Sequence, residues 1–451
     1  MIYERKLTGE LNQWKTSSSR KPLILRGARQ VGKTTLIGMF AAGFDFFINL
    51  DLNKNEDKQI FEKNDNITTI IQILFLKANI SPGSDAKVLI FLDEIQNSPG
   101  AIKLLRYFYE QASHLYIIAA GFLLESILDN QISFPVGRVE YLILRPFSFE
   151  EYLMAHQEDS VLKIYKKLPF PVYGHKKLMA LFVEYALIGG MPEVVKHYLE
   201  NKDIVAVGRI FENLITGYSD DVEKYAKNDH QQKIIRHIIH NAIRLAGERI
   251  KFEGFASSNY KSKDIGEGFR ILEKTFLLSL VYPTTNTKIP VIENKRKSPK
   301  LHILDTGILN YFAGVQLMIL NNGLLDTVFE GRIAEHIVGQ ELLSLKSNVS
   351  AKNHFWIKEK KQSNAEVDYV LQIDDLLIPV EVKLGKTGRL RSLMEFIDLC
   401  PHHFAVRIYS GELKVETAKT LKGKEFTLLN LPFYLTAKAP DYIKMYLNGP
   451  H

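Results

Sequence analysis

Short runs of apolar residues alternate with stretches of helical periodicity over the first third of the chain. Apolar runs of this length, separated by helices, are typical of buried parallel strands. The pattern therefore predicts an α/β fold over residues 1–155, with a mostly parallel sheet of about five strands. The runs are KPLILRG (Lys21–Gly27), FFINLD (Phe46–Asp51), KVLIFLDEIQ (Lys87–Gln96), LYIIAAG (Leu115–Gly121) and EYLILRP (Glu140–Pro146).

The centre of the chain changes to a helical pattern and then to a mixed one. Apolar residues recur at helical spacing over 203–227 and 231–248, which predicts a helical lid or bridge over 156–228. The next segments predict a strand, a helix and a strand, the order of a winged helix-turn-helix, and we expect such a domain over 229–315. These segments are RIKFEGFASS (Arg249–Ser258), NYKSKDIGEGFRILEKTFLL (Asn259–Leu278) and SLVYPTTN (Ser279–Asn286).

The last part of the chain predicts a helix, three strands and a second helix. A small α/β domain is therefore expected over 325–435. The helices are FEGRIAEHIVGQELLS (Phe329–Ser344) and RLRSLMEFIDL (Arg389–Leu399), and the strands are FWIKEK (Phe355–Lys360), AEVDYVLQID (Ala365–Asp374) and LLIPVEVKLGK (Leu376–Lys386).

The composition limits the partners and the cellular compartment that can be expected for this chain. With 58 Lys and Arg against 51 Asp and Glu, the net charge of +7 permits nucleic-acid binding. Cys400 is the only cysteine, which excludes an internal disulfide framework and suits a reducing compartment. The N-terminus is charged, and no stretch approaches the roughly 18 to 20 apolar residues of a membrane helix. We expect a cytoplasmic protein, without membrane contact.

The loop after the first apolar run carries the clearest chemistry. GARQVGKT, from Gly27 to Thr34, lies between a predicted strand and a predicted helix and has the spacing of a P-loop. Its glycines let the backbone wrap round phosphates, Lys33 reaches the β- and γ-phosphates, and the Thr34 hydroxyl binds Mg²⁺. ATP and Mg²⁺ are therefore the expected cofactors. The predicted binding residues are Gly27, Ala28, Arg29, Gln30, Val31, Gly32, Lys33, Thr34 and Thr35.

Two adjacent carboxylates, Asp93 and Glu94, end the third apolar run. Burial of charge at a strand end is costly unless the charge has a use. Beside a P-loop, Asp93 is expected to hold Mg²⁺ and Glu94 to activate the water that attacks the γ-phosphate.

With these motifs the chain resembles bacterial and archaeal ATPases of the AAA type whose C-terminal uncharacterised domain is similar to restriction-type nucleases. The matching strings are GARQVGKT, FLDEIQ, VGR followed by LRPFSFEEY, and IGGMPEVV (Ile188–Val195). The resemblance implies a polar sensor of the γ-phosphate at the end of the fourth strand. Here that strand ends in Ala119, Ala120, Gly121 and Phe122, a departure that favours slow or partner-stimulated hydrolysis.

An arginine that serves a neighbouring subunit is a second feature of such ATPases. Arg138 follows Gly137 on a predicted loop and is the candidate arginine finger, with Arg145 as its competitor. A surface charge or a structural ion pair is the alternative for either residue. A homo-oligomer is expected if the finger role holds, and a monomer remains an alternative.

A basic run is the candidate contact with DNA. The predicted helix over 261–274 would face the major groove, and the cations of the hairpin tip would contact the phosphate backbone. These cations are Lys295, Arg296, Lys297 and Lys300. Against this interpretation, Glu267 and Glu273 would oppose DNA, a charge run is often a solvated turn, and many winged helices bind only proteins.

The last predicted strands carry acidic residues at positions where strands of a hydrophobic core would carry apolar residues. Asp368, Glu381 and Lys383 match the D, E-x-K pattern of the PD-(D/E)xK nuclease superfamily, and Glu335 on the preceding helix matches the acid that this superfamily often adds. Asp368, Glu381 and Glu335 would hold a divalent metal, with Lys383 activating water or stabilising charge. Glu366 shares a strand face with Asp368. A solvated sheet face, or a site that has lost cleavage, is the alternative.

The sequence thus predicts an AAA-type ATPase that binds ATP, hydrolyses it slowly, and acts on or is regulated by DNA. The predicted catalytic residues are Lys33, Glu94, Arg138, Asp368, Glu381 and Lys383, and the predicted metal ligands are Thr34, Asp93, Glu335, Asp368 and Glu381. The alternative function is a nucleotide-dependent protein-interaction switch with an inactive nuclease-like domain.

Overall fold

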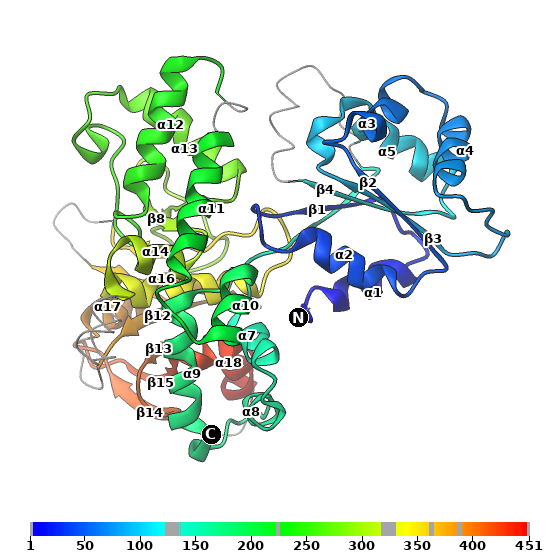
Figure 1. Cartoon of the computed structure of the whole chain (residues 1–451). Helices are drawn as coiled ribbons and strands as arrows, with labels where there is room; N and C mark the ends of the chain where they lie inside the picture. The colour runs from blue at the N-terminus through cyan, green and yellow to red at the C-terminus, as the bar shows by residue number, and fades with distance from the viewer. Residues whose placement is uncertain are drawn as a thin grey trace. The chain divides into compact units, whose positions relative to one another are not determined.

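The computed structural model describes residues 3–121, 135, 137–221, 226–316, 331–359, 365–385 and 390–448 (Figure 1). The chain divides into two compact units. The first unit comprises Met1–Arg145, Lys274–Leu277 and Ser347–Ser350, and the second comprises Pro146–Glu273, Leu278–Lys346 and Ala351–His451. In the described part of the chain, no helix combines the length and the apolar character that a membrane crossing requires.

A five-stranded parallel sheet forms the centre of the first unit, in the order β2-β3-β4-β1-β5. The expected strands are all present, so the predicted P-loop nucleoside-triphosphatase fold is confirmed. They are β1 (Leu23–Arg26), β2 (Phe46–Asp51), β3 (Val88–Asp93), β4 (Tyr116–Gly121) and β5 (Glu140–Ile143). Because all the strands run in one direction, the loop after β1 and the acids Asp93 and Glu94 at the end of β3 lie at the same edge of the sheet.

Helices cover both faces of this sheet. Figure 1 shows α1 and α2 on one side, and α3, α4 and α5 on the other. Alternate strand residues such as Ile48, Ile90 and Ile117 pack in one apolar cluster with α3, α4 and α5. Ser98 and Pro99 begin α5, with the Ser98 hydroxyl accepting a hydrogen bond from the backbone of Ala101. The helices are α1 (Thr8–Thr16), α2 (Lys33–Ala41), α3 (Asn55–Glu62), α4 (Ile67–Lys77) and α5 (Pro99–Gln111).

The second unit begins with a series of helices, as the middle of the sequence predicts. They are α7 (Phe149–His156), α8 (Asp159–Tyr165), α9 (His175–Ile188), α10 (Pro192–Asn201), α11 (Gly208–Asp221), α12 (Asp229–Ala242), α13 (Ser262–Lys274) and α14 (Thr306–Phe312). The expected helix over 261–274 is α13. The expected strand over 249–258 is wrong: Arg249 makes only an isolated bridge to Lys300, and Phe255–Ser257 form one turn of 3₁₀ helix. The winged-helix assignment stays a prediction.

Three sheets complete the second unit. Strands β6 (Leu278–Val281) and β8 (Lys300–Ile303) pair antiparallel. Strands β7 (Pro283–Thr284), β9 (Phe355–Ile357) and β10 (Glu366–Val367) form a small sheet in the order β10-β9-β7. A mixed five-stranded sheet has the order β11-β12-β13-β15-β14, and α16 (Gly331–Ser344), α17 (Arg391–Leu399) and α18 (Ala439–Asn448) accompany it. Its strands are β11 (Tyr369–Ile373), β12 (Leu376–Lys383), β13 (Phe404–Tyr409), β14 (Lys414–Lys419) and β15 (Glu425–Pro432).

The two predicted helices and the strands over 355–360 and 376–386 near the C-terminus are found, but the predicted strand over 365–374 is broken at Asp368 into β10 and β11, which belong to different sheets. Phe329, Glu330, Lys360, Lys386 and Arg389, which end some of the predicted segments, lie outside the described residues. Strands β13 to β15 and α18 extend the α/β region beyond the predicted elements. Cys400 is buried, as expected for a core residue.

The string IGGMPEVV, which had no assigned chemistry, is a structural junction of the second unit. Gly190 donates its backbone N–H to the buried carboxylate of Asp305 at 2.7 Å, and its carbonyl accepts from Phe147 N–H at 2.7 Å. Gly189 has a φ of 75°, and a β-carbon there would lie 1.9 Å from Asp305 Oδ1. Glycine is required because the two segments approach too closely for any side chain.

Candidate functional site

The backbone after β1 has the shape of a phosphate cradle. Gly27 has a φ of 149°, and a β-carbon at this position would lie 2.3 Å from the carbonyl oxygen of Leu144. Gly32 follows with a φ of 93° and stands directly before α2, which begins at Lys33. The helix N-terminus therefore opens on the loop, where unpaired backbone N–H groups attract anions.

Lys33 lies folded over this loop. Its Nζ atom donates hydrogen bonds to the carbonyl oxygens of Gly27 at 3.0 Å and Ala28 at 2.8 Å. Burial lowers the pKa of Lys33 to about 8, because an ammonium group loses solvation when it is enclosed. The ammonium is thus in place at the loop and must turn from these carbonyls to meet a phosphate.

Thr34 and the acids after β3 meet at the edge of the sheet. The Thr34 hydroxyl donates a hydrogen bond to Asp93 Oδ2 at 2.6 Å, and the other oxygen of Asp93 accepts the backbone N–H of Glu94 at 3.0 Å. Thr34 and Thr35 are exposed, whereas Asp93 and Glu94 are partly buried. The structure therefore brings the predicted Mg²⁺ ligands and the predicted general base together beside the loop.

Gln96 is a polar residue of this site that sequence reasoning missed. Its Nε2 group donates a hydrogen bond to the Glu94 carboxylate, while its buried Oε1 atom has no partner among the described residues. A β-carbon on Gly121 would lie 2.5 Å from that Oε1 atom. The carboxamide of Gln96 therefore lies against the end of β4, where Gly121 makes room for it. Phe122, the last residue of the proposed sensor position, lies outside the described residues.

Arg5 is a second missed residue, and it supports the loop. One guanidinium nitrogen of this buried side chain donates to the carbonyl of Val31 at 2.9 Å, and the other donates to the carbonyl of Arg145 at 2.6 Å. Arg5 thus ties the nucleotide loop to the segment after β5. Its signal in the sequence is weak, because it stands among several charged N-terminal residues.

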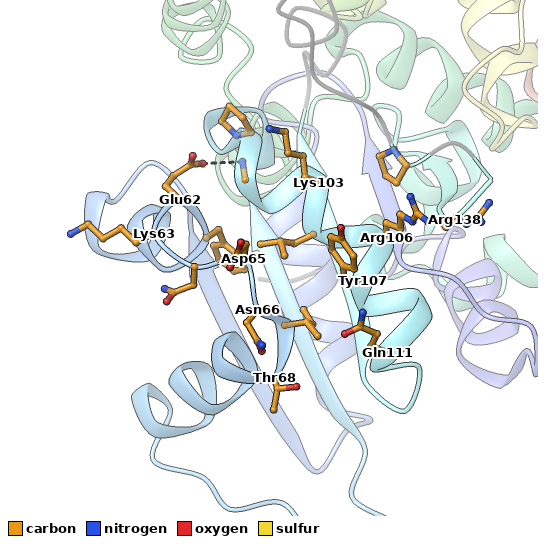
Figure 2. Close-up of a pocket in the computed structure, with 17 residues that line it drawn as sticks. Glu62, Lys63, Asp65, Asn66, Thr68, Lys103, Arg106, Tyr107, Gln111 and Arg138 are labelled. Carbon is orange, nitrogen blue, oxygen red and sulfur yellow. Dashed lines mark hydrogen bonds between the residues drawn. The ribbon is translucent and has the colours of Figure 1, made fainter.

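Arg138 lies on the surface of the first unit. Its side chain is 44% exposed, and its Nε atom is 3.3 Å from Glu110 Oε1. It borders a depression of about 1130 Å³ that Lys103, Arg106 and Tyr107 also line (Figure 2). Arg145 differs from Arg138, since burial lowers its pKa to about 10. Of these two candidates for an arginine finger, Arg138 has the more exposed side chain, since Arg145 is only partly exposed.

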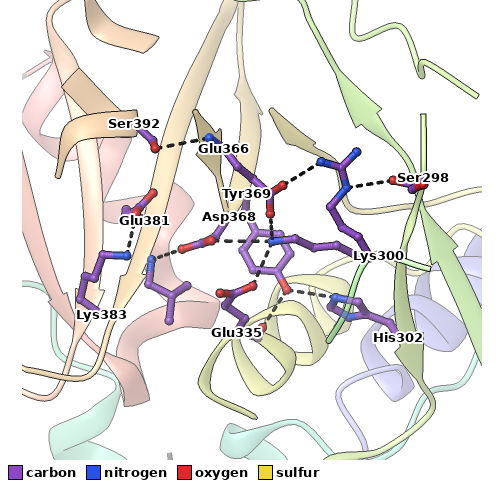
Figure 3. A network of polar contacts seen from close by, with 12 residues as sticks. Ser298, Lys300, His302, Glu335, Glu366, Asp368, Tyr369, Glu381, Lys383 and Ser392 are labelled. Carbon is purple, nitrogen blue, oxygen red and sulfur yellow. Dashed lines mark hydrogen bonds and ion pairs between the residues drawn. The ribbon is translucent and has the colours of Figure 1, made fainter. Parts of the chain in front are cut away.

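In the second unit, an acidic cluster surrounds the ammonium of Lys300 (Figure 3). The Nζ atom lies 2.8 Å from Glu366 Oε1, 3.0 Å from Glu335 Oε2 and 3.7 Å from Asp368 Oδ1. Lys300 is 4% exposed, so it is not one of the solvent-facing cations of the basic run. The expected DNA contact at Lys300 is therefore wrong, although Lys295, Arg296 and Lys297 are exposed.

Strand pairing places the other predicted residues beside this cluster. Tyr369 of β11 is opposite Val380 of β12, and Asp368 Oδ2 accepts the backbone N–H of Val382 at 2.8 Å. Lys383 Nζ lies 2.7 Å from Glu381 Oε1. The predicted acids and the lysine are thus neighbours. Within the described ranges, however, no three or more His, Cys, Asp or Glu side chains are arranged to hold a metal ion.

Burial and mutual repulsion alter two of these carboxyl groups. Burial, together with the nearby Asp368 carboxylate, raises the pKa of Glu335 to about 7 and that of Glu381 to about 8. Lys300 opposes the first shift and Lys383 the second. Burial and mutual repulsion therefore disfavour the ionised form of these carboxyl groups, and the positive charges of Lys300 and Lys383 favour it.

Family comparisons cover most of the chain in three parts. Residues 19–153 match the family described as an AAA domain. Residues 179–318 and 330–434 match two families described as domains of unknown function, DUF8612 and DUF4143. No curated protein matches the chain.

Several solved structures are similar to the chain at low identity. A Walker-type ATPase of Pyrococcus abyssi is 16% identical, with 69% of this chain and 96% of that chain covered and a TM-score of 0.45. The RuvB Holliday junction branch migration motor of Thermotoga maritima is 14% identical, with 65% and 93% covered and a TM-score of 0.29. The Orc1 protein of Aeropyrum pernix, solved in complex with DNA, is 11% identical, with 70% and 92% covered and a TM-score of 0.26.

Proposed function

We propose that the first unit, which is a P-loop ATPase domain of the AAA type, works as a slow, magnesium-dependent ATP switch. The observation that carries the proposal is the hydrogen bond between the Thr34 hydroxyl and the Asp93 carboxylate, 2.6 Å long, directly beside Glu94. It joins a hydroxyl at the start of α2 to an acid at the end of β3, as magnesium-binding P-loops require.

The residues present fit ATP and Mg²⁺. The cradle at Gly27 has no room for a side chain, and the start of α2 favours an anion. Mg²⁺ prefers oxygen ligands, which Thr34 and Asp93 supply, and when bound it would offset the negative charge of the phosphates. Arg29, Gln30 and Thr35 complete the proposed nucleotide-binding residues.

Side chains around the loop are expected to determine the rate of ATP hydrolysis. Lys33 must exchange its two carbonyl acceptors for phosphate oxygens, and Glu94 must take a proton from the attacking water while Gln96 holds its carboxylate. The two hydrogen bonds of Lys33 to the carbonyls of Gly27 and Ala28 must break before its ammonium can contact phosphates, whereas the contact of Gln96 with Glu94 is kept. This requirement supports slow turnover.

The direct test measures phosphate release and ATP binding in the full chain. Lys33→Ala is expected to lose both, because the ammonium that neutralises the β- and γ-phosphates is gone. Lys63→Ala is the control, since Lys63 is an exposed lysine beyond α3 and away from the loop. Equal rates of phosphate release in wild type and Lys33→Ala would contradict the proposal.

We further propose that the ATPase acts on DNA or is regulated by it. Support comes from the exposed cations Lys295, Arg296 and Lys297, which lie on the segment between β7 and β8. Their contacts would be with phosphates, so they would give affinity without sequence preference. The negative charge of Glu273 is partly offset, since its carboxylate lies 3.6 Å from Lys352 Nζ and accepts the backbone N–H of Leu280 at 2.9 Å.

Reversing these three charges together tests the proposed DNA contact. The triple variant K295E/R296E/K297E is expected to bind duplex DNA more weakly and with a smaller salt dependence, and to lose DNA stimulation of hydrolysis. A matched control reverses Lys414, Lys419 and Lys422, whose side chains are 64%, 68% and 75% exposed. Equal loss in both triple variants would show only a general effect of net charge.

A second candidate function is a nucleotide-dependent protein-interaction switch with an inactive nuclease-like domain. The observation that favours it is the position of Lys300 among the predicted metal ligands Glu335 and Asp368. If ATP is hydrolysed at one rate with and without DNA, and DNA is not retained at moderate salt, this candidate replaces the DNA-acting one. Mg²⁺-dependent DNA cleavage that Asp368→Ala and Lys383→Ala both abolish would exclude it.

A further inference from the structure

Lys300 occupies the centre of the acidic cluster in the second unit. Three carboxylates from α16, β10 and the residue after β10 converge on its ammonium group in Figure 3. They belong to Glu335, Glu366 and Asp368, and the distances are 3.0, 2.8 and 3.7 Å. A small cation surrounded by several carboxylate oxygens is the arrangement that a divalent metal would otherwise adopt.

We propose that Lys300 takes the place of a divalent cation in this cluster, and that a metal binds there only when the Lys300 ammonium is removed. The site is then a latent metal site, closed by a lysine that belongs to a different strand from the acids. This inference is independent of the ATP switch, because it concerns only residues of the second unit.

The charge balance of the cluster depends on Lys300. Arg249 lies 3.3 Å from the second oxygen of Glu366, and Lys383 is paired with Glu381. Among the described residues, Lys300 is the only cation that forms an ion pair with Glu335 and with Asp368. Lys300 therefore supplies the positive charge that is shared by the carboxylates of Glu335, Glu366 and Asp368.

Glu381 supplies a second, independent indication of a ligand. Its side chain is almost fully buried, and its Oε2 atom has no hydrogen-bond partner among the described residues. Val382, the residue after Glu381, donates its backbone N–H to Asp368 at 2.8 Å, which places Glu381 next to one of the carboxylates around Lys300. A buried carboxylate oxygen without a donor normally has a ligand or a proton, and a hard cation is the ligand that suits an all-oxygen set.

The geometry also explains why the metal and Lys300 exclude each other. The Nζ atom is within 3.0 Å of both Glu335 and Glu366, which leaves no position between these oxygens for a second cation. Two cations in one buried cluster would repel each other strongly at such distances. Removal of the ammonium leaves at least Glu335 and Asp368 without a counter-charge, and a divalent metal would restore the balance.

The test measures Mn²⁺ binding to the full chain, with no nucleotide added, and detects the bound Mn²⁺ by electron paramagnetic resonance. Lys300→Ala is expected to gain one Mn²⁺ site, with affinity at least about tenfold tighter than any site of the wild type. Adding Asp368→Asn to Lys300→Ala is expected to remove that site, which separates it from Mn²⁺ bound elsewhere. Lys358→Ala is the matched control, because it removes a 2.8 Å ion pair with the single carboxylate of Glu395.

Stability measurements keep the test decisive if Lys300→Ala folds poorly. Lys300→Met keeps the side-chain volume without the charge, and Mn²⁺ is expected to raise the melting temperature of this variant and leave that of the wild type unchanged. The proposal is overturned if wild-type protein binds Mn²⁺ at a site that Asp368→Asn removes. It is equally overturned if neither Lys300 variant binds Mn²⁺ or is stabilised by it.

Discussion

The hydroxyl of Thr34 donates a 2.6 Å hydrogen bond to the carboxylate of Asp93, a residue 59 positions further along the chain. The contact exists because β1 and β3 run parallel, so the start of α2 and the end of β3 lie at one edge of the sheet. It places two oxygen atoms together beside the loop that begins at Gly27. Two parts of the proposed nucleotide site are therefore brought together by the fold itself.

Thr34 is expected to determine the Mg²⁺ requirement of hydrolysis. Thr34→Val removes the hydroxyl at nearly constant volume, and should raise the Mg²⁺ concentration for half-maximal phosphate release by about tenfold. Thr34→Ser keeps the hydroxyl and should behave as wild type. A Mg²⁺ titration of the rate in the three proteins checks this, and identical curves for the valine and serine variants would argue against a ligand role.

Gln96 is expected to position Glu94 and to contribute little to ATP binding. Gln96→Ala frees the Glu94 carboxylate and should lower kcat by about tenfold, while KM for ATP changes less than about twofold. Gln96→Asn, which keeps the amide on a shorter side chain, should recover part of the rate. Steady-state kinetics separate the two constants. An increase of kcat in Gln96→Ala would mean that the amide restrains Glu94 instead.

Lys33 gives ATP binding a pH dependence. Its pKa in the free protein is lowered to about 8 by burial, whereas phosphates beside it would favour the charged form. Above about pH 8, ATP binding should therefore take up a proton, and affinity should fall as the pH rises. Calorimetry at about pH 8.5 in buffers of different ionisation enthalpy measures this uptake. Lys33→Arg, which stays charged, should show none; equal values for both proteins would refute the assignment.

Arg138 is expected to act on nucleotide bound to another copy of the chain. Arg138→Ala should lower the rate only under conditions in which the protein self-associates, since an arginine finger stabilises charge across a subunit interface. Arg106→Ala is matched, because Arg106 also contacts Glu110, at 2.9 Å, and is 55% exposed. Rates measured over a range of protein concentrations test this. Equal loss in both variants would assign the effect to Glu110 or to the surface near it.

The junction around Gly189 is expected to support the stability of the second unit. Gly189→Ala would place a β-carbon 1.9 Å from Asp305 Oδ1 and should lower the free energy of unfolding by about 3 kcal/mol. Gly217→Ala is the control: Gly217 lies in α11 with no atom within 4 Å of the added carbon, so this change should stabilise by roughly 0.5–1 kcal/mol. Denaturant unfolding of both variants distinguishes these outcomes.

The first unit was largely predictable because its signals are local. The strands around Ile24 and Ile90 are buried on both faces, the edge strand around Ile48 alternates buried and exposed residues, and the glycine loop has fixed spacing, so these signals do not depend on distant residues. Gln96 escaped prediction for the opposite reason. Its role depends on the space at Gly121, which only the pairing of strands in the sheet reveals.

The position of Lys300 was even less predictable from the sequence than that of Gln96. In the sequence it ends a run that includes Lys295 and Lys297, and charge runs usually face water. In the structure β8 begins at Lys300, and its pairing with β6 turns that side chain into the cluster of Glu335 and Glu366. The faces of Glu366 and Asp368 were predictable from strand alternation, whereas the cation between them came from a segment with no local relation to them.

The most direct measurement of the central claim compares phosphate release by wild type and Glu94→Gln under saturating ATP and Mg²⁺. Glu94→Gln keeps the size of the side chain and its place beside Gln96, but it cannot take a proton from water. ATP binding by Glu94→Gln is expected to stay close to wild type, and phosphate release is expected to slow by about 100-fold or more. Phosphate release by Glu94→Gln at the wild-type rate would contradict the proposed role of Glu94 as the general base.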